Sequence, residues 1–225
     1  MKFGIEIELI GLTTTEASAA LNAGGIECRS EGYTHRVMPQ WKVVTDSSLT
    51  AAKACELVSP PLEVNTANIA QVRKVCELMN EEGAEVNRDC GLHVHIDVSG
   101  ESAQTISNIY NRYKQFESQI DAFMAESRRG SNCGMARSLA AESTKSFSSH
   151  DDIRSTASRI SRYFKLNICS FKKYGTLEFR QHGGSVNGAK LANWIKFLSQ
   201  FVVASRNAQT PATVRSQDHI INSLP

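Results

Sequence analysis

Apolar and polar residues alternate along three segments of the chain, residues 2–10, 90–100 and 174–182. A period of two is typical of a β-strand with one buried face, because successive side chains point to opposite sides of the sheet. The polar positions of the three segments are Glu6 and Glu8, then His93, His95 and Asp97, then Glu178, Arg180 and His182. We expect three strands of one sheet whose polar side chains gather on one face.

Elsewhere the apolar residues recur every three or four positions, which predicts amphipathic helices. These helices are expected over residues 13–21, 66–82, 102–126, 151–165 and 188–205. Shorter apolar segments at residues 26–29, 41–45 and 55–58 predict further strands. Strands with one polar face, separated by helices, favour an α+β domain whose helices cover a single side of the sheet.

The 225 residues are enough for one substantial domain or at most two small ones, and no internal repeat divides them. We therefore expect a single domain over residues 1–225. Residues 127–150 are rich in Ser and Gly and contain several basic residues, which predicts a long loop. Loops of this length in compact domains are usually functional or disordered.

Charge and composition exclude several classes of partner. The chain has 25 basic and 23 acidic residues, a formal net charge of +2, so no overall field recruits nucleic acid or a membrane surface. Glu6 and Glu8 interrupt the apolar stretch that a signal peptide needs, and no segment approaches the roughly 18 apolar residues of a membrane span. The six cysteines are scattered, without a CxxC pair, so we expect reduced, mostly buried thiols in a cytoplasmic protein.

The acidic positions have the spacing of a metal cluster. Alternate residues of one strand stand about 6.6 Å apart, so Glu6 and Glu8 can each hold one ion of a pair about 3.5–4 Å apart. Glu56 and Glu178 add further carboxylates, and such hard oxygen ligands favour Mg²⁺ or Mn²⁺ over zinc. Arg180, two residues after Glu178, is typical of a site that stabilises transferring phosphoryl groups.

Other interpretations stay open for several of these residues. An isolated Glu-x-Glu or His-x-His pattern is usually solvated surface or a structural pair, and only the coincidence of three strands favours a site. Asp46 is either a turn former or an active-site acid. Cys90, three residues before His93, is a weaker candidate for a zinc ligand or a nucleophile. Arg162 belongs to a basic segment that is normally a solvated helix face.

The chain resembles the amidoligases of the glutamine synthetase and glutamate-cysteine ligase superfamily. The shared elements, in the family's order, are GIEIE (4–8), W-x-x-x-x-D-x-S-L (41–49), ELVSP (56–60), GLHVH (91–95), R-Y-x-x-x-N (162–167) and GTLEFR (175–180). The resemblance implies a curved antiparallel sheet with helices on its convex face, as in the glutamine synthetase catalytic domain. It also implies that two or three Mg²⁺ ions and ATP bind the concave face.

Roles follow from the matching positions. The resemblance implies that Glu6, His93 and Glu178 ligate the metal that touches the transferred phosphate, and that Glu8 and Glu56 ligate a second metal. It implies that Arg180 supports phosphoryl transfer and that Asp46 lies near the amine site. Arg162 and Asn167 fall in the motif assigned to nucleotide binding. In the loop, Arg128 and Arg129 either contact nucleotide phosphate or substrate, or belong to a plain surface loop.

The implied reaction is an ATP- and Mg²⁺-dependent ligation of a carboxylate to an amine through an acyl phosphate. The carboxylate and amine are expected to be small molecules or peptides, including γ-glutamyl compounds. A metal-dependent hydrolase, or a binding protein that retains the sheet but not the ligation, is the alternative.

Overall fold

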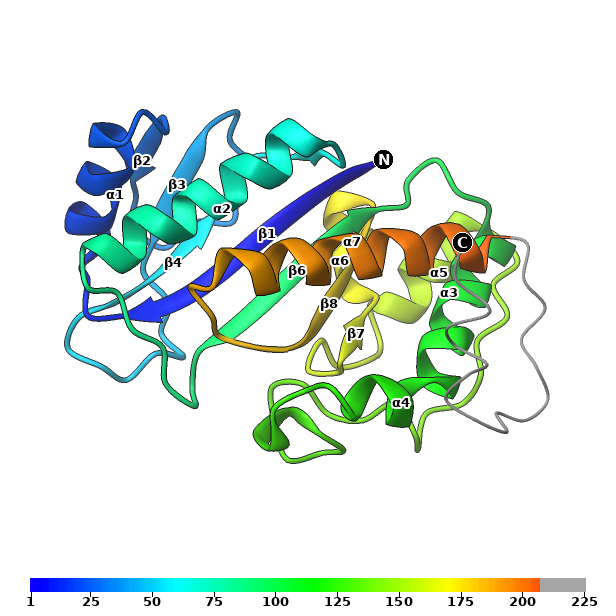
Figure 1. Ribbon diagram of the computed structural model, residues 1–225. Coiled ribbons are helices and arrows are strands. Elements are labelled where there is room, and N and C mark those ends of the chain that lie inside the picture. Colours follow the sequence, from blue (N-terminus) through cyan, green and yellow to red (C-terminus); the bar gives the residue numbers. More distant parts are fainter. Residues whose placement is uncertain (207–225) are drawn as a thin grey trace. The chain divides into compact units, whose positions relative to one another are not determined.

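The computed structural model describes residues 1–206, and its α+β class confirms the prediction (Figure 1). Within this range there are seven α-helices and eight strands, and most of the strand pairs are antiparallel. The chain divides into two compact units, residues 1–94 with 183–196, and residues 95–182 with 197 onward. A single domain over residues 1–225 stays a prediction.

The first unit contains most of the strands. They are β1 (Lys2–Ile10), β2 (Cys28–Ser30), β3 (Trp41–Val44), β4 (Ala54–Val58), β5 (Leu62–Glu63) and the first part of β6 (Gly91–Asp97). They follow the order β2-β3-β4-β1-β6, with β5 paired to β1; β2 runs parallel to β3, and β4 is antiparallel to β3 and β1. The helices are α1 (Thr14–Ala23), α2 (Thr66–Glu81) and the first part of α7 (Gly188–Ser205).

The alternation in β1 is confirmed, because its four apolar side chains, Phe3, Ile5, Ile7 and Leu9, are at most 1% exposed. Helices α1 and α2 lie across this face of the strands (Figure 1). Each begins at a polar cap: Thr13 forms a capping box with Glu16, and Asn65 accepts a hydrogen bond from Asn68. The strand expected at residues 26–29 begins later, at Cys28. The Cys28 amide donates to Asn22 Oδ1, and the Cys28 carbonyl accepts from Asn22 Nδ2.

The second unit is richer in helices. It contains α3 (Ala103–Gln115), α4 (Glu117–Asp121), a 3-10 turn (Glu126–Arg128), α5 (His150–Ala157) and α6 (Cys169–Tyr174), with the last part of α7. Its strands follow the order β6-β8-β7, where β7 (Leu166–Asn167) is antiparallel to β8 (Thr176–Gly183). The core forms around Tyr113, whose ring packs edge-on against Phe179 at 5.2 Å and Phe201 at 5.7 Å.

Two predicted helices are wrong in length. The helix expected over residues 102–126 divides at Phe116, because the bend lets the side chains of Glu117 and Asp121 reach the Lys165 ammonium, a tertiary contact that local periodicity does not encode. The helix expected over residues 151–165 ends at Ala157. The residues after it run to the buried Lys165 and then into β7.

The strand expected at residues 174–182 begins two residues late. Tyr174 is the last residue of α6, and Gly175 follows with a φ of 68°, a left-handed conformation that ends the helix and starts β8 at Thr176. A side chain at this position would also lie 2.8 Å from the Ser99 Cβ, so the turn favours glycine twice over.

Neither a membrane-spanning helix nor a disulfide is found in the part of the chain that is described. No helix within residues 1–206 is both long and apolar enough to cross a membrane. All six cysteines are free thiols, and four of them, Cys28, Cys55, Cys76 and Cys90, are buried, which confirms the expected burial.

Candidate metal centre

The strand register of the first unit puts the acidic side chains on one face of the sheet. Glu6 and Glu8 of β1 lie opposite Val58 and Glu56 of β4. Directly paired residues of antiparallel strands point to the same side. Glu6, Glu8 and Glu56 therefore share the face opposite the buried apolar residues of β1.

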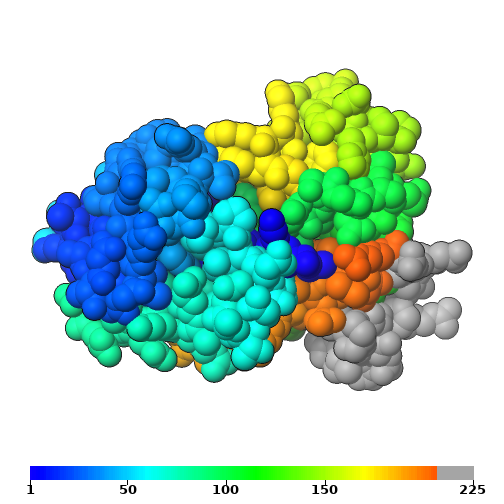
Figure 2. All heavy atoms as spheres, turned by 90° about the horizontal axis from the view of Figure 1, so that it is seen from above, coloured from blue at the N-terminus to red at the C-terminus, as the bar shows by residue number. Residues whose placement is uncertain are grey.

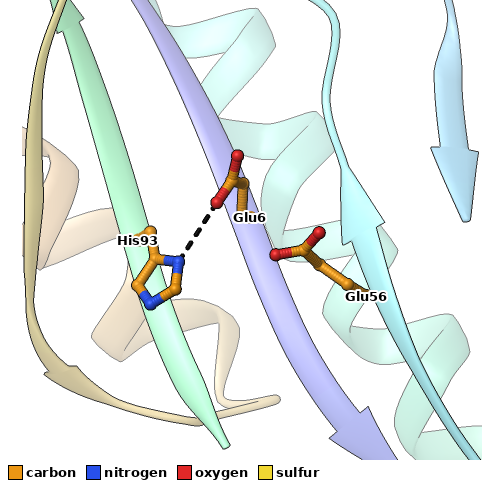
Figure 3. Close-up of side chains that lie close together, drawn as sticks. All are labelled: Glu6, Glu56 and His93. Atoms are coloured by element: carbon orange, nitrogen blue, oxygen red, sulfur yellow. Dashed lines mark hydrogen bonds and ion pairs between the residues drawn. The ribbon is translucent and has the colours of Figure 1, made fainter. Parts of the chain in front are cut away.

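His93 of β6 lies beside both glutamates of β1. Its Nδ1 atom is 3.1 Å from Glu6 Oε2, and its Nε2 atom is 3.9 Å from Glu8 Oε1. Figure 3 shows Glu6, Glu56 and His93 extending from three strands toward one another, with the helices behind the sheet. His93 is 5% exposed, so its imidazole offers a buried nitrogen ligand held against carboxylates.

Gly91 makes this close arrangement sterically feasible. A Cβ atom at this position would lie 2.7 Å from His93 Nε2 and 3.3 Å from Glu8 Oε2. The Gly91 amide also donates a hydrogen bond to Glu8 Oε2, which fixes the orientation of this buried carboxylate. The glycine of the GLHVH element is therefore part of the site.

Two sets of donor atoms on this face are close enough to hold cations. Glu6, Glu56 and His93 form one set, and Glu8, Asp46 and Glu56 form the other, with the ligand atoms of each set within 4.8 Å of one another. Asp46 forms a turn as well, because its Oδ1 atom accepts a hydrogen bond from Ser48 N at 2.7 Å. Glu56 belongs to both sets, which is the arrangement of a carboxylate that bridges two ions.

A lysine that the sequence pattern did not indicate lies on the same face. Lys42 of β3 pairs with Val58, the partner of Glu6, and is 4% exposed. Its Nζ donates to the carbonyl oxygens of Thr34 at 3.0 Å and Arg36 at 2.8 Å. Lys42 therefore holds the segment between β2 and β3 over the acidic face. This segment, residues 31–40, reaches the molecular surface (mid-blue in Figure 2). Tyr33 within it is 66% exposed.

In the second unit, Glu178 and Arg180 form an ion pair on β8. The other oxygen of Glu178, Oε2, accepts a hydrogen bond from Asn167 Nδ2 at 2.6 Å. Asn167 Oδ1 in turn accepts from the Cys169 amide at 2.7 Å. The side chain of Asn167, expected to bind nucleotide, thus orients Glu178 here.

The Tyr163 ring contacts two arginines of this unit, Arg162 and Arg180. The ring centroid is 5.0 Å from the guanidinium carbon of Arg162 and 6.0 Å from that of Arg180. A hydrogen bond from Arg162 to the Tyr163 hydroxyl is the main cause of a raised pKa for the Arg162 guanidinium. Tyr163 lies inside the R-Y-x-x-x-N element, but only its contacts reveal that it packs against both cations.

The remaining predicted residues are spread over the second unit. Arg128 is buried at the end of the 3-10 turn, and the exposed Arg129 donates from Nε to the Met124 carbonyl at 2.9 Å. Asp97 accepts two hydrogen bonds from Ser99 and so forms a turn. His95 Nδ1 lies 2.9 Å from the Thr176 hydroxyl oxygen.

Comparison of the whole sequence with protein families assigns the chain. A family model described as "Putative amidoligase enzyme" matches residues 1–202. The chain belongs to this amidoligase family. The resemblance inferred from the short sequence elements is thereby confirmed. Among curated proteins, no relative matches the chain.

The donor set of this amidoligase suits a hard divalent cation. One set contains carboxylate oxygens alone, and the other adds a single imidazole, so oxygen donors dominate as Mg²⁺ and Mn²⁺ prefer. The hydrogen bond between Glu6 and His93 resembles the carboxylate contacts that orient metal-binding histidines. The residues present therefore fit the metal that the sequence resemblance implies, while the identity of the ion stays a prediction.

Proposed function

We propose that this amidoligase joins a carboxylate to an amine with consumption of ATP and Mg²⁺, through an acyl phosphate. Family membership over residues 1–202 supports ligase activity in general. The observation that carries the finer proposal is Glu56, which belongs to two acid-rich donor sets at once. Paired cations held in this way are used to clamp the oxygens of a transferring phosphoryl group. With the activity we propose the glutamine synthetase type of catalytic fold and a cytoplasmic location.

The proposed chemistry has two steps. A substrate carboxylate oxygen attacks the γ-phosphorus of ATP, the bond from that phosphorus to the β-γ bridging oxygen breaks, and ADP leaves. The amine nitrogen then attacks the acyl carbon, phosphate departs, and the nitrogen loses a proton. The two donor sets that share Glu56 would hold magnesium, which would supply neutralisation of phosphate charge, and Arg180 would donate hydrogen bonds to phosphoryl oxygens. Asp46 is proposed either to ligate cation or to accept the amine proton.

The test is formation of an amide bond coupled to ATP. Hydroxylamine serves as the amine, and the carboxylates offered are glutamate, γ-glutamyl compounds and short peptides, with Mg²⁺ and ATP. We expect hydroxamate and ADP in equal amounts, and transfer of ¹⁸O from a labelled carboxylate to the released phosphate. Glu56→Gln should abolish both products, whereas Glu63→Gln, an exposed carboxylate of β5, should retain them.

Three results would overturn the proposal. Binding of Mg²⁺ without any binding of ATP would remove the phosphoryl donor. Amide hydrolysis that needs metal but not ATP would instead support the metal-dependent hydrolase. Binding of a carboxylate or peptide without turnover of ATP would favour the non-catalytic alternative.

A further inference from the structure

The segment predicted as a long loop is held along its length by two helices. We define the strap as residues 128–147. Four of its backbone amides donate to side-chain oxygens of α3 and α4: Gly130 to Asp121 at 2.7 Å, Leu139 to Glu117 at 2.7 Å, Lys145 to Asn111 at 2.8 Å and Phe147 to Ser107 at 2.8 Å. The strap therefore takes a defined path through these contacts.

The first two of these contacts depend on a buried ion cluster. The Nζ atom of Lys165, a residue with no exposed surface, lies 3.0 Å from Glu117 Oε1 and 2.7 Å from Asp121 Oδ1. Two carboxylates share one ammonium, so one negative charge is left to be met by neutral donors. The strap amides of Gly130 and Leu139 meet it, together with the Gln181 amide, whose own oxygen accepts from the Tyr113 hydroxyl at 2.6 Å.

The strap also contacts the arginine of the proposed reaction. Between its two anchored amides, the Met135 carbonyl accepts a hydrogen bond from Arg180 Nε at 3.2 Å. Next to it, Arg137 pairs with the segment before β7, donating to Tyr163 O at 2.9 Å and accepting from Lys165 N at 3.0 Å. The Arg180 amide donates to the Lys165 carbonyl at 2.8 Å. Lys165 is thus linked to Arg180 in two ways, by this backbone hydrogen bond and through the contacts of the strap.

We propose that Lys165, with Glu117 and Asp121, is a positioning residue that holds the Arg180 guanidinium through the Met135 carbonyl. The role assigned to Arg180 rests on the proposed function. A carbonyl that is fixed on both sides selects one orientation of the Arg180 Nε, while the ion pair with Glu178 fixes another edge of the same group. A guanidinium restrained at two edges is preorganised to donate to phosphate oxygens.

Stability alone is a poor explanation for the cluster. Replacing buried ion pairs by apolar residues of similar size is often neutral or stabilising, because desolvation of the charges offsets their attraction. Here the carboxylate oxygens that Lys165 does not occupy are directed at strap amides on either side of Met135. A purely structural ion pair needs one carboxylate for one ammonium. The second carboxylate is explained here because both carboxylates also hold the strap.

The direct test replaces Lys165 by methionine and observes Arg180. In arginine-labelled protein, the Nε–H signal of Arg180 is assigned by its loss in Arg180→Lys. We expect this proton to exchange with water about tenfold faster in Lys165→Met, and magnesium pyrophosphate to bind about tenfold more weakly. Lys172→Met, at an exposed lysine of α6, should match the original protein.

A milder variant covers the case in which Lys165→Met does not fold. Asp121→Asn keeps the size of the side chain but leaves a balanced pair of Lys165 and Glu117, and its amide nitrogen cannot accept from Gly130. We expect the same acceleration of exchange at Arg180. A lower melting temperature with unchanged exchange and unchanged pyrophosphate affinity would overturn the proposal.

The same data separate this inference from the proposed function. If Arg180→Lys leaves pyrophosphate affinity unchanged, the role of Arg180 in phosphate binding fails. The exchange measurement on Lys165→Met still decides whether the cluster positions the guanidinium.

Discussion

The Nδ1 atom of His93 lies 3.1 Å from Oε2 of Glu6, across the neighbouring strands β6 and β1. In a neutral imidazole, the proton on Nδ1 then points to the carboxylate, and Nε2 faces Glu8 as an acceptor. This pair gives the acidic face a nitrogen of defined orientation. It also links the two glutamates of β1 to β6, so the sheet itself fixes the positions of these donor groups.

Removing the shared carboxylate should affect both cations together. Because Glu56 belongs to both donor sets, Glu56→Gln is expected to weaken binding of two Mn²⁺ ions by about 100-fold or more. Electron paramagnetic resonance counts the bound ions and detects the magnetic coupling of a close pair. Glu63→Gln is the matched control. Loss of one ion with normal affinity for the other would contradict a bridging role.

A methyl group at Gly91 should displace the imidazole. The added Cβ of Gly91→Ala would lie 2.7 Å from His93 Nε2, so the ring must shift from its present position. We expect a loss of stability of about 1–3 kcal/mol and weaker Mn²⁺ binding, measured by urea unfolding and titration calorimetry. Gly100→Ala is the control, because nothing lies within 4 Å of its added Cβ. Equal metal affinity in both variants would show that Gly91 has no part in the site.

Much of the acidic face follows from local pattern. The alternation in residues 2–10 and 90–100 predicted the strands, and a strand puts Glu6 and Glu8 on one face by geometry alone. The pairing of Glu8 with Glu56 depends on the register between β1 and β4. That register is set by packing and by the chain between the strands, which residue spacing does not specify.

The buried lysines could not be predicted from the sequence, because an isolated charged residue usually lies on the protein surface. Lys42 and Lys165 are typical solvent-exposed residue types, yet both are buried, because carbonyl oxygens surround one and carboxylates the other. Their partners are 6 to 48 positions away in sequence. The division of the helix at Phe116 has the same origin, since Glu117 and Asp121 turn toward Lys165.

Lys42→Met should release the segment between β2 and β3. The ammonium holds the carbonyls of Thr34 and Arg36, and methionine can fill its space but donates no hydrogen bond. We expect a loss of stability of about 1–2 kcal/mol and faster cleavage by trypsin after Arg36, followed by mass spectrometry. Lys53→Met, which removes an exposed ion pair with Glu16, should change neither. Unaltered cleavage after Arg36 would show that the segment is held by other contacts.

Stability should decline in alkaline solution because of buried thiols. Burial raises the pKa of Cys28 to about 11 and the pKa values of Cys55 and Cys76 to about 12, from an ordinary value of 9.0. The folded protein keeps protons that the unfolded chain releases, so this stabilisation is complete below about pH 9 and is lost as the pH rises toward 12. Urea unfolding between pH 8 and pH 11 measures the decline.

A variant without these thiols isolates their contribution. Burial also raises the pKa of the Tyr113 hydroxyl, which adds a decline of the same sign at higher pH. The triple variant Cys28→Ala, Cys55→Ala and Cys76→Ala is expected to be less stable at pH 8, because it loses packed sulfur atoms, but to lose less stability between pH 9 and pH 11. If the variant and the original protein decline in parallel over that range, the thiols do not hold their protons in the folded state as their burial requires.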